Sequence, residues 1–237
     1  MHIENIKCSR CNHINPPYTH ICTQCKNHLR ERIVNVDLWQ SVIKILEEPS
    51  VVFKNIIYSE HKNFISFIIF FIALKNLIIA RYMSVPELGL NNVSTSFLIS
   101  FFLSIIVTVL IISLTSVIQK LSIDKSMAEP RFIDVFSINT YSYIPYLIGL
   151  FFVFPIELVV LGQDIFSNNP YPFDIKPAIT YILAGVEVLI ILWTSILGYR
   201  SSVFLQISKI RSVFFVITSL IIWIGFLYLS SKFIFNI

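Results

Sequence analysis

Residues 97–118, FLISFFLSIIVTVLIISLTSVI, decide the fold class. The stretch contains no charged residue, and its polar groups are Ser and Thr hydroxyls, which can hydrogen-bond to carbonyls of their own helix. At a rise of about 1.5 Å per residue, it is long enough to cross a hydrocarbon core of roughly 30 Å as a helix. A buried helix of a soluble protein would rarely stay apolar on every face over this length. The stretch therefore predicts an integral membrane protein.

The composition agrees with a membrane protein. Hydrophobic residues make up 55% of the 237 residues and charged residues only 14%. The mean hydropathy is +0.75, and the 21 Phe and 10 Tyr suit lipid-facing walls and interfacial belts. Because the formal net charge is only +4, we expect no nucleic-acid partner.

The apolar segments predict an all-α membrane protein with a bundle of five transmembrane helices. The expected spans are about residues 63–80, 97–118, 141–162, 178–198 and 213–230. Pro145, Gly149 and Pro155 predict kinks in the third span, because proline removes a backbone donor and crowds the preceding turn.

Lysine and arginine are distributed unequally on the two sides of these spans. Fourteen lie before the first span or in the loops after the second and fourth, and three lie on the opposite side (Arg81, Lys176 and Lys232). The positive-inside rule then predicts a multi-pass protein of the cell membrane with a cytoplasmic N-terminus and an outside C-terminus.

All four cysteines lie near the N-terminus as two C-x-x-C pairs: Cys8, Cys11, Cys22 and Cys25. Two such pairs can place four thiolates around one ion, which predicts a structural Zn²⁺ in a small ribbon at residues 1–32. Four thiolate ligands leave no open position for catalysis. Two disulfides or a redox pair are the alternatives, and a reducing cytoplasm favours the metal. The neighbouring imidazoles are expected on the surface, not on the metal (His13, His20 and His28).

The segment from Cys8 to Leu29 resembles the zinc-ribbon modules found at the front of prokaryotic membrane proteins. The match consists of the two C-x-x-C pairs, the Asn-Pro-Pro at residues 15–17 and Leu29. In those modules Gly usually follows the second and fourth cysteines, where this chain has Asn12 and Lys26. Asn tolerates the left-handed backbone that such a knuckle needs, but Lys tolerates it less well.

Residues 33–62 predict a juxtamembrane linker with two short amphipathic helices. Asp37 is the expected N-cap of the first, and Pro49 ends it. The two expected apolar stripes are Trp39, Val42, Ile43 and Leu46, and then Val52, Phe53, Ile56 and Ile57. Each stripe could lie in the lipid interface or pack on the helical bundle of residues 63–237.

Residues from the third and fourth spans are similar to the Yip family of Ypt/Rab-interacting membrane proteins. The resemblance rests on Tyr141 and Pro145 at the start of the third span, and on Trp193, Gly198 and Arg200, followed by Ser208 and Lys209, at the end of the fourth. Trp39, Pro49 and Phe53 suit the family's entry segment. The resemblance implies a five-helix bundle with a cytoplasmic N-terminus. Eukaryotic members act in vesicle traffic and contact Rab GTPases, whereas the ribbon at the front resembles the prokaryotic type.

Three ionisable residues fall inside the spans, where lipid makes a charge costly: Lys75, Glu157 and Glu187. We expect them to form one intramembrane polar cluster, with the ammonium flanked by two carboxylates. Such a cluster can simply lock helix packing, or it can form a pathway for a small solute. Snorkelling of Lys75 to the interface is a third interpretation.

Two functions are compatible with these features, and in both cases we expect a protein that is not an enzyme. The first is a membrane scaffold or adaptor of the Yip type, whose cytoplasmic ribbon recruits a protein partner. The second is a small-solute transporter or channel that uses the intramembrane charges. The lipid bilayer is the first partner in both cases, and a homo-oligomer is compatible with either.

Overall fold

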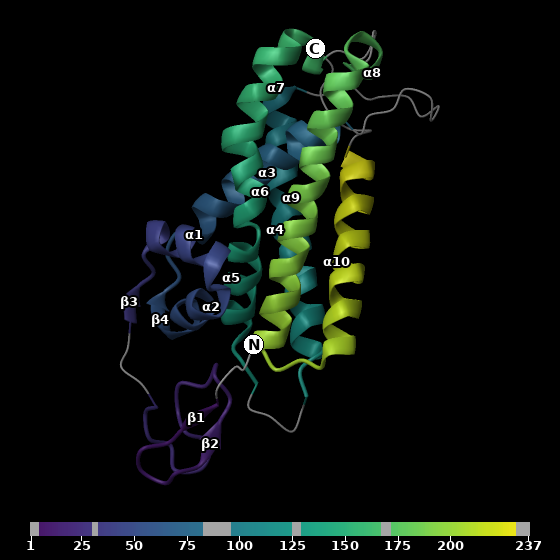
Figure 1. Ribbon diagram of the computed structural model, residues 1–237. Coiled ribbons are helices and arrows are strands. Elements are labelled where there is room, and N and C mark those ends of the chain that lie inside the picture. The colour runs from purple at the N-terminus through teal and green to yellow at the C-terminus, as the bar shows by residue number, and fades with distance from the viewer. Residues whose placement is uncertain (1–4, 30–32, 83–95, 125–128, 167–171, 231–237) are drawn as a thin grey trace. The chain divides into compact units, whose positions relative to one another are not determined.

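The computed structural model describes residues 5–29, 33–82, 96–124, 129–166 and 172–230 (Figure 1). Within these ranges four helical segments are long and apolar enough to cross a membrane: Phe97–Leu121, Phe132–Ile165, Pro177–Phe204 and Lys209–Leu229. The first expected span corresponds to α3 (Ile65–Tyr82), whose apolar part, Ile65–Ile79, is shorter. The chain is thus an all-α protein of membrane type, whose described residues include four long apolar helices and one shorter one where five transmembrane spans are expected.

The packing of the chain defines two compact units, and each is described by itself. Unit 1 comprises Met1–Ser66, Ile112–Ser142 and Ile196–Thr218. Unit 2 comprises Phe67–Ile111, Tyr143–Ser195 and Ser219–Ile237. Four helices contribute residues to both units: α3, α4 (Phe97–Leu121), α9 (Pro177–Phe204) and α10 (Lys209–Ser230).

Unit 1 begins with a two-stranded antiparallel hairpin in which β1 (Ile6–Lys7) pairs with β2 (Ile14–Asn15). Further on, β3 (Ile33–Asn35) pairs in parallel with β4 (Ser59–His61). The two helices α1 (Leu38–Glu47) and α2 (Pro49–Tyr58) connect β3 to β4.

The expected signals for α1 and α2 are confirmed. The Asp37 carboxylate accepts a hydrogen bond from the Gln40 N–H at 2.9 Å, so Asp37 caps α1. Pro49 lies in the first turn of α2, where its missing N–H is not needed. The second apolar stripe, represented by Phe53 and Ile56, is fully buried.

Helix α5 (Phe132–Ser142) begins nine residues before the expected start of the third span. Its hydropathy is low because polar residues face the interior of unit 1, where they find partners. Asn139 donates to the Ser116 hydroxyl at 3.0 Å. In the same unit the Gln119 amide donates to the hydroxyls of Ser201 and Ser202, both at 2.9 Å. These bonds join α4, α5 and α9 through side chains that a hydropathy profile scores as unfavourable.

In unit 2 the third apolar segment is interrupted, as its prolines predict. It consists of α6 (Ile144–Ile148), a π-helical turn η2 (Gly149–Val153), α7 (Phe154–Leu161) and a 3₁₀ turn η3 (Gly162–Phe166). The Phe154 N–H bonds to the Gly149 carbonyl, five residues back. Pro155 lacks an N–H and cannot continue the regular ladder, so a wider turn forms in front of it. The short helix α8 (Pro172–Ile175) precedes α9.

The Ser and Thr hydroxyls of residues 97–118 bond only in part to carbonyls of their own helix, as was expected of all of them. Thr115 and Ser116 donate to the Ile112 carbonyl of their own helix, at 3.1 and 2.6 Å. Ser104 instead donates to the Ala73 carbonyl of α3 at 2.8 Å. Hydroxyls of α4 therefore bond to a neighbouring helix as well as to carbonyls of α4 itself.

Candidate metal centre and buried ion pairs

The four cysteine sulfurs of Cys8, Cys11, Cys22 and Cys25 lie within 4.8 Å of one another. Two sulfur pairs, Cys8 with Cys25 and Cys11 with Cys22, are 3.5 Å apart. A tetrahedral Zn–S bond length of about 2.3 Å places ligand sulfurs about 3.8 Å apart. The spacing fits a four-coordinate metal ion, and the four cysteines could hold one.

The two C-x-x-C pairs form equivalent turns. The Asn12 N–H bonds to the Cys8 carbonyl at 2.9 Å, and the Lys26 N–H bonds to the Cys22 carbonyl at 3.0 Å. Asn12 and Lys26 both have a φ of +58°. The left-handed backbone expected after the second and fourth cysteines is therefore present, although neither residue is glycine.

Backbone N–H groups point at the first sulfur of each pair. The N–H groups of Cys11 and Arg10 lower the pKa of Cys8. Burial raises the pKa of Cys22, but the N–H groups of Cys25 and Gln24, together with the side chains of Cys11 and Asn15, outweigh it and bring that pKa to about 6. Both effects favour thiolate, the form that binds a metal ion.

Asn15 links the two turns, a role that sequence analysis missed because it used the residue only as part of a pattern. Its side chain is fully buried. The amide nitrogen donates to the His13 carbonyl at 3.0 Å and to the Cys22 sulfur at 3.6 Å, and the amide oxygen accepts from the N–H and hydroxyl of Thr23, both at 3.0 Å. A fully bonded buried amide fixes the loop around the sulfurs.

The three histidines are not part of the four-cysteine group. His13 and His28 are exposed, and His28 pairs with Ile21 in an isolated β-bridge. His20 packs edge-to-face on the Tyr58 ring at 5.3 Å between centroids, and its Nε2 lies 3.4 Å from Arg131 Nη2. The Tyr58 hydroxyl donates to the Pro17 carbonyl at 2.5 Å, so α2 holds the loop between the cysteine pairs.

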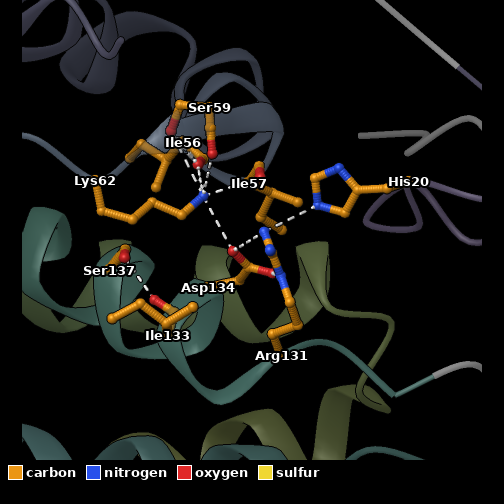
Figure 2. Close-up of polar contacts among 9 residues, drawn as sticks. All are labelled: His20, Ile56, Ile57, Ser59, Lys62, Arg131, Ile133, Asp134 and Ser137. Atoms are coloured by element: carbon orange, nitrogen blue, oxygen red, sulfur yellow. Dashed lines mark hydrogen bonds and ion pairs between the residues drawn. The ribbon is translucent and has the colours of Figure 1, made fainter. Parts of the chain in front are cut away.

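An ionic cluster around the buried Asp134 carboxylate lies beside the contact between His20 and Arg131 (Figure 2). Asp134, in the first turn of α5, is 1% exposed and accepts from Lys62 Nζ at 3.0 Å and from Arg131 Nε at 2.9 Å. Lys62 Nζ also donates to three carbonyls at the end of α2, those of Ile56, Ile57 and Ser59. Lys62 thereby caps α2 and joins it to α5. Burial lowers the pKa of Lys62, against the attraction of the Asp134 carboxylate.

In the sequence, Lys62 and Arg131 contribute only to the distribution of charges across the spans, and nothing but their spacing marks Asp134 as a partner. The available signal was Arg131 three residues before Asp134 at the start of a helix, the spacing of a local ion pair. Of the other counted charges, Arg30, Arg32, Lys125 and Lys232 lie outside the described residues.

In unit 2 the structure brings Lys75 and Glu187 together. Lys75 Nζ lies 2.8 Å from a Glu187 carboxylate oxygen and 4.4 Å from the centroid of the Tyr146 ring, and the Lys75 side chain is 2% exposed. Glu157 is also buried, and its charge acts on Lys75. A Cβ at Gly149 would meet Lys75 Nζ, so this glycine leaves the space that the ammonium occupies.

A chain of polar side chains extends from this ion pair. The Tyr146 hydroxyl donates to the Asn76 amide oxygen at 2.8 Å, and the Asn76 nitrogen donates to the Thr108 hydroxyl at 3.0 Å. Trp223 packs edge-to-face on Tyr146, with 5.0 Å between centroids. Asn76 and Tyr146 could not be singled out from the sequence, because both side chains are uncharged at neutral pH and each looks ordinary in an apolar helix.

The fold and these sites define an all-α membrane protein with a four-cysteine, metal-type cluster near its N-terminus. No protein-family model, curated protein or solved structure matches the chain.

Proposed function

We propose that the protein is a membrane-anchored adaptor whose zinc-bound ribbon presents a protein-binding surface at the cytoplasmic face. The observation that supports this most directly is the four-cysteine cluster itself, within a loop that Tyr58 and Arg131 hold against α2 and α5. A ribbon held in this way is a rigid surface, not a free tail. It leaves Ile14 62% exposed and Ile21 45% exposed, and these apolar residues are the proposed contacts.

Zinc is the proposed ion, and its role is structural. Four thiolates in a tetrahedral arrangement are typical of structural zinc, with no coordination position left for a substrate. The Cys8 and Cys22 thiols, which lose their protons readily, would remain metal ligands in a reducing compartment. Together with the excess of Lys and Arg on one side of the spans, this supports a cytoplasmic N-terminus in the cell membrane.

The proposed class is the Yip type, on the residues given above. Tyr141 donates from its hydroxyl to the Asn63 carbonyl at 2.8 Å, next to the entry of α3. Pro145 lies in the first turn of α6, and the Gly198 carbonyl accepts from the hydroxyls of Ser201 and Ser202. These contacts give structural roles to residues on which the resemblance rests, and they assign no reaction.

Site-specific photocrosslinking in native membranes tests the adaptor proposal. A photoreactive residue at Ile14 should give a discrete crosslinked protein, and the same residue at exposed Lys7 is the matched control. Cys22→Ser should abolish the Ile14 product without removing the protein from the membrane. No product at Ile14, or equal products at both positions, would contradict the proposal.

A second candidate is a polar pathway for a small solute, which the buried Lys75–Glu187 pair beside the π-helical turn favours. Glu187→Gln should abolish flux in proteoliposomes. Gly185→Ala is the matched control, because a Cβ at Gly185 meets nothing within 4 Å. Unchanged flux in Glu187→Gln would leave the ion pair as a packing element.

A further inference from the structure

Helix α1 has two apolar sides, and the structure buries only one of them. Ile45 is fully buried within unit 1. Trp39 and Ile43, one turn apart on another side, are 76% and 61% exposed. Ile45 is not part of the first expected stripe; within that stripe Trp39 and Ile43 are exposed and Val42 and Leu46 are half-buried, and no described residue covers the Trp39–Ile43 side.

The position of α1 within unit 1 restricts what can cover this side. Helix α1 packs on α2, and α2 packs on α5 (Figure 1). β4 ends at His61 and α3 begins at Ile65, so the end of this segment lies within about 14 Å of the start of an apolar helix. α5 itself begins the apolar segment Phe132–Ile165.

Exposed apolar residues occur on this neighbouring element as well. Phe132 and Ile133, the first two residues of α5, are 40% and 44% exposed. The Trp39–Ile43 side thus belongs to a helix whose neighbour, α2, packs on a membrane-type segment, close to the point where the chain enters the next one. Tryptophan and isoleucine beside such an entry are typical of a helix in the interface of a bilayer.

We propose that α1 inserts Trp39 and Ile43 into the headgroup–acyl boundary of the bilayer that its own chain crosses. The insertion is driven by apolar contact. Lys44 is the basic residue of the helix, and Asp37 and Glu47 offset it at the two ends. Binding to the boundary therefore does not require anionic lipid.

Fluorescence quenching of the full-length protein in phosphatidylcholine vesicles tests this insertion. The emission of Trp39 is obtained by subtracting the fluorescence of Trp39→Phe, which keeps Trp193 and Trp223, from that of the wild type. Lipids brominated near the ester end of their acyl chains should quench most of this difference, and aqueous iodide should quench little of it. Adding phosphatidylserine should leave both results unchanged.

Ile14→Trp in the Trp39→Phe background is the matched control, because Ile14 is an exposed apolar residue of the ribbon. Its emission should be quenched by iodide and spared by the brominated lipid. Iodide quenching of Trp39 without bromine quenching would overturn the proposal. Protection of Trp39 from both quenchers would also overturn it, because another protein or a second copy of the chain would then cover α1.

Discussion

Replacing Lys26 with glycine should tighten metal binding by the ribbon. Lys26 adopts a φ of +58°, in the left-handed region that costs an L-amino acid roughly 1–2 kcal/mol. Glycine can make the same bond to the Cys22 carbonyl without a Cβ. About 0.4–1 kcal/mol of this gain in stability is lost again, because glycine makes the unfolded chain more flexible. The net gain is about 0.5–1 kcal/mol, or roughly a two- to fivefold gain in affinity, since metal binding and ribbon folding are coupled.

Competition for Zn²⁺ between a chromophoric chelator and the full-length protein in detergent measures this gain. Asn12→Gly is the first comparison, because Asn12 has the same φ but tolerates it better, so the gain should be smaller. Gln24→Gly is the second, because Gln24 lies in the same turn but outside the left-handed region. Glycine there should weaken binding or leave it unchanged.

Two results would refute the reasoning about the knuckle. Equal affinities of the wild type and Lys26→Gly would mean that the left-handed residue imposes no penalty on the metal-bound ribbon. A gain from Gln24→Gly as large as that from Lys26→Gly would mean that loop flexibility, not φ, controls affinity.

Three further predictions concern the buried cations. Lys75→Ala should lower the melting temperature in detergent, because breaking a buried ion pair costs about 3–5 kcal/mol. The double variant Lys75→Ala with Glu187→Gln should recover part of this loss. A Lys75→Ala protein that melts like the wild type would contradict the pairing. Gly149→Ala should also lower it, whereas Gly185→Ala should not, because only the first Cβ meets Lys75 Nζ. Because burial lowers the folded pKa of Lys62 below that of an ordinary lysine, the unfolded chain binds more protons between the folded and the unfolded pKa, and stability should rise with pH in that interval. A melting series should show this rise in the wild type and lose it in Lys62→Met.

The membrane class and the four-cysteine cluster were predictable because each depends on local sequence. An uncharged stretch such as residues 97–118 has few alternatives to a lipid environment, and two C-x-x-C pairs bring their sulfurs together over a short loop. The break in the third segment was predictable for the same reason, since Pro155 acts on its own turn.

The polar partners could not be predicted, because they join residues far apart in the sequence. Asp134 begins a helix that hydropathy alone would start later, and its partner Lys62 lies 72 residues earlier. Whether the hydroxyl of Ser104 bonds to its own helix or to Ala73 depends on which helix packs against it. Amphipathicity likewise predicted that α1 and α2 have apolar faces, but not that Ile45 is buried while Trp39 is exposed.

The loop between the two cysteine pairs connects the four-cysteine cluster to the helices of unit 1. Asn15 of this loop bonds to the Cys22 sulfur, and the Pro17 carbonyl accepts from Tyr58 at the end of α2. His20, next in the loop, lies against the Arg131 guanidinium that binds Asp134. A metal ion that fixes the sulfurs therefore also fixes the partners of α2 and α5, because the same few residues serve both. The ribbon and the start of α5 belong to one compact unit, and this loop contributes contacts between them, although over a hundred residues separate them in the chain.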